Sequence, residues 1–257
     1  MTETRSKFLP SIALFGASGR MGRAISALAG SAVTARVGRS LGGELGLVSS
    51  DDALGCADVV IDVSTAAACA SLATRVAGSG RPPMVIGVTG FTAEEDAAIV
   101  AAARHIAIVR SGNFSLGVNV MLGLVRQAAA RLSALDFDIE IAESHHRNKV
   151  DAPSGTALML GRAAAQGRGV DLASVEVRAR DGLTGPRPIG AIGFSVQRGG
   201  GVIGEHSVGF FSDEEILTLS HSARDRSLFA RGALVAAKWV VGKPAGLYDM
   251  QDVLDLA

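Results

Sequence analysis

The feature that most constrains the fold of this chain is a glycine loop near its N-terminus, "GASGRMG", in which Gly16, Gly19 and Gly22 recur every third residue. The loop follows the apolar segment Ile12 to Phe15 and leads into "RAISALAG", whose apolar residues have helical spacing. A strand, a glycine turn and a helix in this order let a pyrophosphate approach the backbone amides at the helix N-terminus. The loop therefore predicts a dinucleotide-binding α/β domain. A glycine turn that serves only close packing of helix on strand is the alternative.

Strand-like and helix-like segments alternate through the first half of the chain. Beyond the first strand, segments typical of strands span residues 32–40, 58–65, 84–90 and 106–113. Alanine-rich segments with helical character lie between them, and Thr92 with Glu95 forms the pattern of a capping box at the start of one such helix. This alternation predicts a Rossmann-type, doubly wound parallel sheet with helices on both faces.

The pattern changes after Phe114. Helices are expected over residues 117–134, 153–169 and 227–242, and strands over 137–146, 175–180, 192–200, 202–211 and 214–223. This run predicts an α+β domain with an open, mixed, mainly antiparallel sheet. We expect residues 1–114 to form the dinucleotide-binding domain and residues 115–224 a second domain, while residues 225–257 pack back on the first.

Composition excludes several classes of partner. The chain carries 25 basic and 25 acidic side chains, so its net charge is zero, and it has no basic runs. Such a chain is a poor candidate for binding nucleic acid or a membrane surface. It has no apolar stretch of about 20 residues and no signal-peptide pattern, so we expect a cytoplasmic protein. The spacing of Cys56 and Cys69 suits neither a zinc site nor a redox pair, and we expect no metal.

The residues that follow the second strand indicate which cofactor is bound. Proteins that prefer NADH usually have an acidic residue there, which binds the ribose hydroxyls. This chain has "ARVGRS", with Gly38, Arg39 and Ser40 at the end of the strand. An arginine followed by a hydroxyl suits a ribose 2′-phosphate, so we expect NADPH to be preferred, with NADH as the alternative. A solvated surface arginine would give the same pattern.

Two further loops are expected to reach the cofactor. The fourth strand ends in "GVTG", with Gly87, Val88 and Thr89, and the fifth ends in "SGNF", residues 111–114. The carboxyl ends of parallel strands near the topological switch point are where ligands bind in such folds. We therefore expect both loops to contact the nicotinamide half of the cofactor.

The segment "ESHHRNKVDAPSGTA", residues 143–157, concentrates residue types that are scarce elsewhere. It holds two of the five histidines of the chain, His145 and His146, and one of only four lysines, Lys149. These side chains supply positive charge and transferable protons. Three alternatives are a pair of metal ligands, structural histidines and a solvated charged edge. Adjacent side chains in a strand point to opposite faces, which disfavours one shared metal.

The same segment ends in a helix N-terminus. Ser154 is expected to be the N-cap, and Gly155 and Thr156 then supply amides of the first turn. Such an end binds a carboxylate or a phosphate. Together with the histidines and the lysine, it describes a pocket for a small anion to which a proton is also delivered.

These residues resemble the signature of the dihydrodipicolinate reductases, also called 4-hydroxy-tetrahydrodipicolinate reductases, which act in the diaminopimelate route to lysine. The resemblance extends to "GASGRMG", "VIGVTGF", "NFSLGVNVM", "IGEHSVGF" and "GLYDMQDVLDL". It covers essentially the whole chain, in the order of the family. It implies an NAD(P)H-dependent oxidoreductase that acts on a small dicarboxylate and is a homotetramer built through its second, substrate-binding domain.

The resemblance also implies residue roles. His145 and Lys149 would be catalytic, and the substrate carboxylates would be held by His146, Lys149, Gly155 and Thr156. The cofactor would be contacted by Gly16, Ala17, Ser18, Gly19, Arg20, Met21, Gly38, Arg39, Gly87, Val88, Thr89, Ser111, Gly112, Asn113 and Phe114. Some members carry an acidic residue where this chain has Gly38, and this departure favours NADPH over NADH.

Other functions share part of this pattern. Another Rossmann dehydrogenase of an amino-acid pathway could share the first domain, but would not be expected to combine the "HHRNK" and "DAPSGT" elements. A non-catalytic NADPH-sensing protein could keep the glycine loop, yet would have no need of His145 and Lys149 beside an anion-binding helix end. A less specific imine reductase of the same family is a third alternative.

Overall fold

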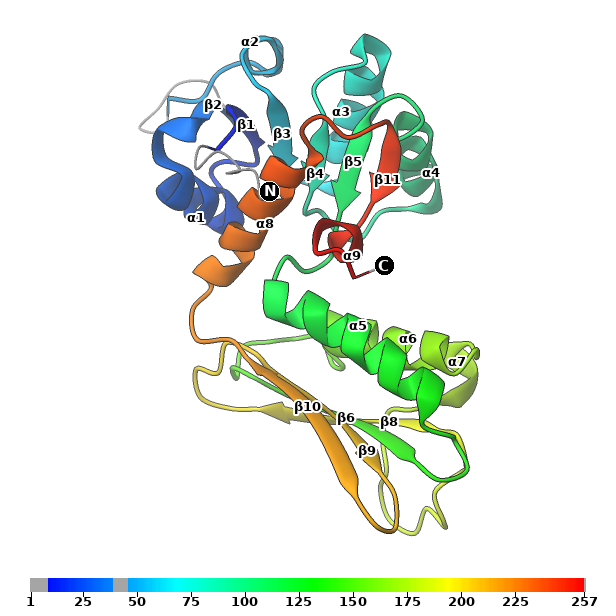
Figure 1. The fold of residues 1–257 in the computed structure, drawn as a ribbon. Helices are drawn as coiled ribbons and strands as arrows, with labels where there is room; N and C mark the ends of the chain where they lie inside the picture. Colours follow the sequence, from blue (N-terminus) through cyan, green and yellow to red (C-terminus); the bar gives the residue numbers. More distant parts are fainter. Residues whose placement is uncertain (1–8, 39–45, 257) are drawn as a thin grey trace, which may run out of the picture. The chain divides into compact units, whose positions relative to one another are not determined.

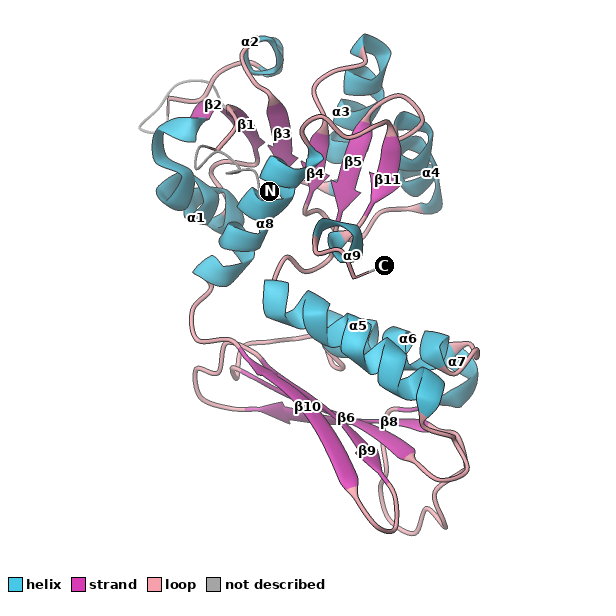
Figure 2. Cartoon of the chain, in the orientation of Figure 1, coloured by secondary structure: helices cyan, strands magenta, loops and turns pink. Residues whose placement is uncertain are grey.

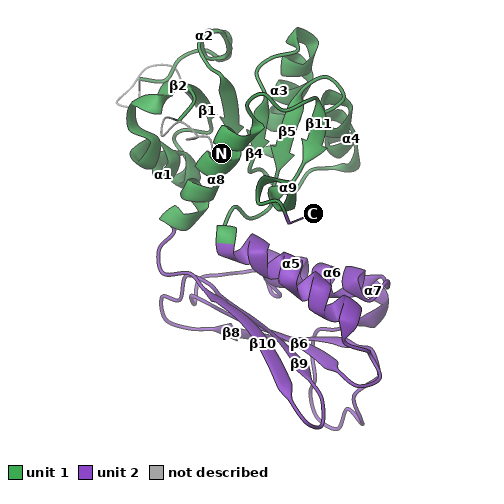
Figure 3. Ribbon diagram, in the orientation of Figure 1, with its two compact units in different colours: residues 1–116, 227–255 green, residues 117–226, 256–257 purple. Residues whose placement is uncertain are grey.

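The computed structural model describes residues 9–38 and 46–256, and the chain divides into two compact units. Unit 1 is drawn from residues 1–116 and 227–255, and unit 2 from residues 117–226 and 256–257 (Figure 3). Each unit has its own hydrophobic core. Among the described residues, no helix combines the length and apolar character needed to cross a bilayer.

Unit 1 is built on a six-stranded parallel sheet with the strand order β2-β1-β3-β4-β5-β11 (Figure 1). The strands are β1 (Ile12–Phe15), β2 (Val33–Val37), β3 (Val59–Asp62), β4 (Met84–Ile86), β5 (Ala107–Arg110) and β11 (Gly246–Tyr248). The chain runs from β1 to its neighbour on one side, β2, and then crosses to its neighbour on the other side, β3. The predicted doubly wound parallel sheet is therefore confirmed, with its topological switch point between β1 and β3.

Helices cover both faces of this sheet (Figure 2). One face packs against α1 (Arg20–Ala29), α8 (Ser227–Val240) and α9 (Met250–Val253), and the other against α2 (Ser50–Gly55), α3 (Ala66–Ser79) and α4 (Ala93–Ala102). The strands β1, β3, β4 and β5 contribute side chains to the hydrophobic clusters on both faces, because successive side chains alternate between the faces. This explains why the strands read as continuous apolar runs.

The capping box predicted from Thr92 and Glu95 is present at the start of α4. The Thr92 hydroxyl accepts the Glu95 N–H at 3.2 Å, and the Glu95 carboxylate accepts the Thr92 N–H at 2.8 Å. This prediction succeeded because all its atoms lie within one turn of the chain, where sequence alone determines which groups meet.

Unit 2 is a five-stranded sheet with the order β10-β9-β6-β8-β7. Its elements are α5 (Leu116–Arg131), β6 (Asp138–His145), α6 (Gly155–Gly167), α7 (Leu172–Val175), β7 (Glu176–Val177), β8 (Ile192–Arg198), β9 (Glu205–Phe211) and β10 (Ile216–Ser222). The β10–β9 and β9–β6 pairs are antiparallel, whereas the β6–β8 and β8–β7 pairs are parallel. The sheet is thus mixed, as predicted. The strand expected over 175–180 is reduced to two residues, and beyond it Arg180 pairs with Glu140.

The three helices of unit 2 lie on one face of its sheet (Figure 2). The core between them contains Val125, Ile139, Leu160 and Phe210, each fully buried. Within the described part of the unit, no helix covers the other face. Apolar side chains remain exposed on the two strands at its β9–β10 edge, among them Phe211 at 39% and Ile216 at 60%.

The close approach of α8 to the chain after β5 yields a stability prediction. A Cβ atom built on Gly232 would lie 1.7 Å from the carbonyl oxygen of Phe114, so a side chain there must push the helix away from the backbone. We expect Gly232→Ala to lower the free energy of unfolding by about 2 kcal/mol or more, measured by urea denaturation.

Gly78→Ala is the matched control. Gly78 is also helical, but its added Cβ meets no atom within 4 Å. Alanine should therefore raise the stability by about 0.4–1 kcal/mol, because it restricts the unfolded chain. Equal unfolding midpoints for the two variants would contradict the role assigned to Gly232.

Candidate active site

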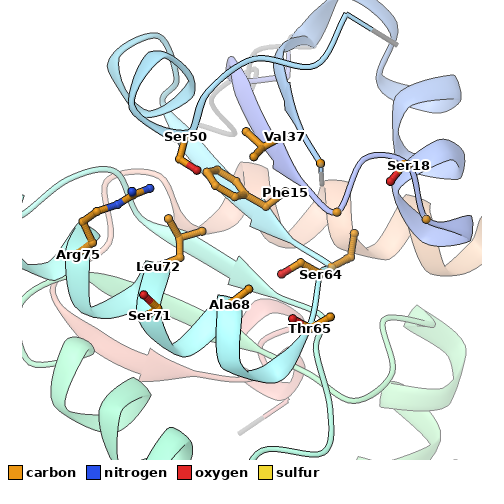
Figure 4. A pocket seen from close by; sticks show the side chains of 14 residues that line it. Phe15, Ser18, Val37, Ser50, Ser64, Thr65, Ala68, Ser71, Leu72 and Arg75 are labelled. Carbon is orange, nitrogen blue, oxygen red and sulfur yellow. The ribbon is translucent and has the colours of Figure 1, made fainter. Parts of the chain in front are cut away.

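A cavity of about 620 Å³ lies in unit 1 at the switch point, where the carboxyl ends of β1, β2 and β3 meet (Figure 4). Its walls come from those strand ends, the glycine loop, the start of α2 and one side of α3. The lining residues are Phe15, Gly16, Ser18, Gly19, Val37, Gly38, Ser50, Val63, Ser64, Thr65, Ala68, Ser71, Leu72 and Arg75. This position is the one at which doubly wound sheets bind nucleotides.

The glycine loop has the geometry that a pyrophosphate requires. Gly16 has a φ of +77°, and a Cβ there would lie 2.6 Å from the carbonyl oxygen of Val63. A Cβ on Gly22 would lie 2.3 Å from the carbonyl oxygen of Gly16, so Gly22 lets α1 pack against the loop. Gly19 is the N-cap of α1 and makes no side-chain cap bond. The glycines thus fit both interpretations, close packing and a helix end that an anion can approach.

The predicted cofactor residues fall into three groups. Gly16, Ser18, Gly19 and Gly38 line the cavity, and Ala17, Arg20 and Met21 belong to the same loop and the first turn of α1. The segments 87–89 and 111–114 follow β4 and β5 at the same edge of the sheet, but do not line the cavity. Arg39 lies outside the described residues.

Phe114 and Asn113 also have local structural roles. The Phe114 ring packs against Gly87, where a Cβ would lie 2.9 Å from a ring carbon. The side chain of Asn113, which is buried, accepts the Ser115 N–H at 2.8 Å. These contacts order the turn that follows β5.

Several cavity residues were missed from the sequence. Ser64 and Thr65 follow β3, and Ser71 and Arg75 come from α3. The polar end of the third strand, "DVST", was the available signal for the first two. Ser71 and Arg75 lie within an amphipathic helix, and only the fold brings them to the cavity.

His145, the first proton-donor candidate of unit 2, is the last residue of β6. Ile139, Ile141, Glu143 and His145 share the buried face of β6, the first two within the core and the last two at its end. His146 follows the strand and is half-buried. The two histidines therefore have different surroundings, as expected for neighbours at a strand end.

Lys149 lies in the turn after β6 and is paired with an acidic neighbour. Its Nζ donates to both carboxylate oxygens of Asp151, at 2.8 and 2.9 Å. The hydrogen bond from Lys149 lowers the pKa of Asp151 below its usual range, so this carboxylate is ionised.

The predicted helix end is present. Ser154 is the N-cap of α6, and its hydroxyl accepts the Ala157 N–H at 3.2 Å. Gly155 and Thr156 are the first two residues of the helix. A Cβ on Gly155 would meet no atom within 4 Å, so the space beside this helix end is open to a ligand.

Three residues that the sequence analysis did not select complete this cluster. Glu143 is 2% exposed, Arg198 at the end of β8 pairs with its carboxylate at 3.0 Å, and His206 on β9 is 6% exposed. Nε2 of His206 lies 3.1 Å from Oγ of Ser154, and its ring stands edge-on to that of His145 with centroids 5.1 Å apart. The alternation of side chains along β6 would have indicated that Glu143 shares the face of His145. No local sequence pattern indicated that Arg198 belongs to the cluster.

The pKa values in this cluster follow from burial and charge. Burial opposes ionisation of Glu143, but hydrogen bonds from Arg198, the Ser154 amide and His145 bring its pKa below the usual range. Burial lowers the pKa of His145, Glu143 acts in the opposite direction, and Lys149 and Arg198 lower it further. Burial also lowers the pKa of His206 to about 4, so that ring is neutral near pH 7.

Comparison with known proteins agrees with this geometry. Residues 10–114 match the family model described as dihydrodipicolinate reductase, N-terminus, and residues 117–254 match the model of the C-terminus. The chain belongs to the dihydrodipicolinate reductase family. The predicted family is therefore confirmed.

Individual members of the family are similar over nearly their full length. The 4-hydroxy-tetrahydrodipicolinate reductase of Caulobacter vibrioides is 61% identical over 247 residues, which cover 95% of this chain and 96% of the relative. The enzyme of the same name from Brucella abortus is 51% identical, covering 95% of this chain and 98% of the relative. A dipicolinate-bound dihydrodipicolinate reductase from Paenisporosarcina sp. TG-14 has the same fold, with a TM-score of 0.76, 22% identity, and coverage of 94% and 98%.

The open space beside Gly155 yields a prediction. The methyl group of Gly155→Ala would project into open space at the first turn of α6 without touching the protein. We expect the variant to unfold within about 0.5 kcal/mol of the wild type. Its KM for an anionic substrate should rise about 10-fold or more, because a hydrogen bond to a charged group is weakened. An unchanged KM in steady-state assays would place the anion elsewhere.

Proposed function

We propose that this chain is a 4-hydroxy-tetrahydrodipicolinate reductase, which reduces the dehydrated ring of that substrate to tetrahydrodipicolinate in diaminopimelate and lysine biosynthesis. The observation that carries the proposal is the 61% identity to a reductase of that name across almost the whole chain. In this proposal, unit 1 supplies the residues that bind the cofactor, and unit 2 supplies those that bind the substrate and donate the proton.

The cofactor is proposed to occupy the cavity of unit 1. The glycine loop and the first turn of α1 would hold the pyrophosphate, and Ser64 and Thr65 line the wall beyond it. When bound, the reduced nicotinamide supplies a hydride, which adds to ring carbon 4 of the substrate. We further propose that NADPH is preferred, since Gly38 removes the acidic side chain that would repel a 2′-phosphate and Arg39 follows it.

The substrate is proposed to be a small cyclic dicarboxylate bound in unit 2. One carboxylate would accept hydrogen bonds from the amides of Gly155 and Thr156 at the start of α6, where the helix dipole favours negative charge. The other charge would be met by Lys149 and His146. Both residues follow β6, whose buried face carries His145.

Hydride addition leaves an electron pair on the substrate ring, and a proton must be added to it. The pair moves away from ring carbon 4 toward the adjacent carbon and the ring nitrogen, and one proton added there gives the neutral, reduced ring. His145 is proposed to deliver that proton as an imidazolium, with Lys149 as a second donor that also stabilises the developing charge. The net change is one hydride and one proton added to the substrate.

A coupled assay tests the proposed function. Pyruvate and aspartate semialdehyde are condensed to the substrate by a synthase, and the absorbance of NADPH or NADH is followed after this chain is added. We expect NADPH to be consumed with a higher kcat/KM than NADH. Consumption of neither cofactor would reject the reductase and favour a non-catalytic NADPH-binding protein or a dehydrogenase with another substrate.

Arg39→Ala provides the control for cofactor choice. Loss of the guanidinium should raise the KM for NADPH and leave the KM for NADH nearly unchanged, because only NADPH carries the 2′-phosphate. Equal changes in the KM values for the two cofactors would mean that Arg39 does not bind the 2′-phosphate.

We also propose a homotetramer that works in the cytoplasm, as the family resemblance implies. The uncovered face of the unit 2 sheet, with Phe211 and Ile216 exposed, is the proposed contact. Sedimentation should give a mass of about four times 26.2 kDa. Ile216→Glu should dissociate it, whereas Leu135→Glu, at a residue 80% exposed in another part of the unit, should not. A monomeric wild type would reject the proposal.

A further inference from the structure

The carboxylate of Glu143 is held by more donors than any packing role requires. Arg198 donates to both of its oxygens, Nη1 to Oε2 at 3.1 Å and Nη2 to Oε1 at 3.0 Å. The Ser154 N–H donates to Oε1 at 2.8 Å, and Nδ1 of His145 bonds to Oε2. A carboxylate that is 2% exposed and so surrounded is ionised and fixed in orientation.

A metal site is the first alternative. Single ligand atoms of Glu143, His145 and His206 all lie within 4.8 Å of one another. A cation bound there would have to share the carboxylate with a bidentate guanidinium and a backbone amide. Those groups already satisfy the charge and the lone pairs of Glu143, so the contacts favour a hydrogen-bonding role for the cluster.

The ionised carboxylate determines which nitrogen of His145 carries a proton. A carboxylate only accepts hydrogen bonds, so Nδ1 must donate to it. In the neutral ring, Nε2 is then the nitrogen with the lone pair. It faces Gly204, where an added Cβ would lie only 3.0 Å from Nε2. The absence of a side chain at Gly204 thus leaves Nε2 as the nitrogen through which a proton can be exchanged.

We propose that Glu143 is the positioning residue of the proton-transfer step: it fixes the Nδ1–H form of His145 and stabilises the imidazolium formed when Nε2 gains a proton, while Arg198 holds Glu143 in place. The proposal rests on the proposed reductase function, in which His145 Nε2 gives its proton to the reduced ring. Glu143 itself touches neither the substrate nor the cofactor in this scheme.

The groups around His145 predict how its titration responds. Glu143 lies beside it on β6, Lys149 and Asp151 on the following turn, Arg198 at the end of β8, and His206 on β9, with His221 across from His206 on β10. Of these, Glu143 raises the pKa of His145, whereas Lys149 and Arg198 lower it. His206 is neutral near pH 7, because burial lowers its pKa to about 4. Removal of the Glu143 charge therefore lowers the pKa of His145.

The sign of the pH effect follows directly. An imidazolium donor is active below its pKa and is lost as the pH rises through that value. A lower pKa in Glu143→Gln means that kcat begins to fall at a lower pH. Loss of a residue that only held β6, β8 and α6 together would change the stability or the KM. It would not change the pH at which kcat falls on the alkaline side of the profile, called the alkaline limb below.

The experiment compares Glu143→Gln, Glu143→Asp and His145→Gln with the wild type in steady-state assays between pH 5.5 and 9. We expect Glu143→Gln to lower kcat at pH 7.5 by roughly 10-fold or more, approaching the loss in His145→Gln. Its KM for the dicarboxylate should change less than about 3-fold, and its alkaline limb should move to lower pH. Glu143→Asp keeps the charge and should restore part of kcat and the wild-type limb.

Urea denaturation of each variant, followed by circular dichroism, shows whether it is folded. A folded Glu143→Gln variant with a normal kcat, or with reduced kcat and an unmoved limb, would overturn the proposal.

A second measurement is independent of turnover and of variant folding. The ¹⁵N–¹H long-range NMR spectrum of the histidine rings in the wild-type protein reports which nitrogen is protonated. We expect neutral His145, assigned by through-bond correlation of its ring with its own backbone resonances, to be the Nδ1–H form. The Nε2–H form would overturn the proposal even if no variant could be prepared. Failure of the wild type to reduce the substrate would instead reject the proposed function, with the NMR result standing by itself.

Discussion

The candidate substrate site depends on one buried charge, the carboxylate of Glu143. Burial of an ion is unfavourable unless donors replace the water that it loses. Here the donors come from three separate segments: His145 on β6 itself, Arg198 at the end of β8, and the Ser154 amide at the start of α6. Satisfying this carboxylate therefore fixes the end of the strand, its parallel neighbour and the helix N-terminus relative to one another. The proton donor and the proposed anion-binding amides are oriented by the same bond network.

The candidate cofactor site is constrained in a different way, by the absence of side chains. At Gly16 and Gly22 the added Cβ atoms would lie 2.6 and 2.3 Å from backbone oxygens, distances that no substituted residue tolerates without backbone movement. The close contact of α1 with the loop leaves the helix N-terminus at the cavity that opens where β1 separates β2 from β3. In the proposed sites, unit 2 would position its ligand through charge and unit 1 through close approach of the backbone, and both would use the start of a helix.

The sequence predicted those features whose atoms are close along the chain. The glycine loop, the Thr92 capping box and the N-cap at Ser154 all follow from spacings of three to six residues. Arg198 was missed because it is 55 residues from Glu143, and only the parallel pairing of β6 with β8 brings the two together. Ser71 and Arg75 were missed for the same reason, since their helix reads as an ordinary amphipathic segment. Long-range pairings leave no local pattern from which to predict them.

The arrangement of charges in unit 2 also explains how a chain with zero net charge could bind a dicarboxylate. Lys149 is bonded to Asp151, whose side chain is 54% exposed, whereas Arg198 is bonded to the buried Glu143. In the proposed site, an incoming carboxylate would replace Asp151, which returns to water at little cost, but would not replace Glu143. In the proposed reaction, the substrate brings negative charge beside His145, and this charge opposes the lowering of its pKa by burial. Proton uptake is then coupled to substrate binding, so the imidazolium forms where the hydride acceptor is already bound and is not maintained as a buried charge in the free enzyme.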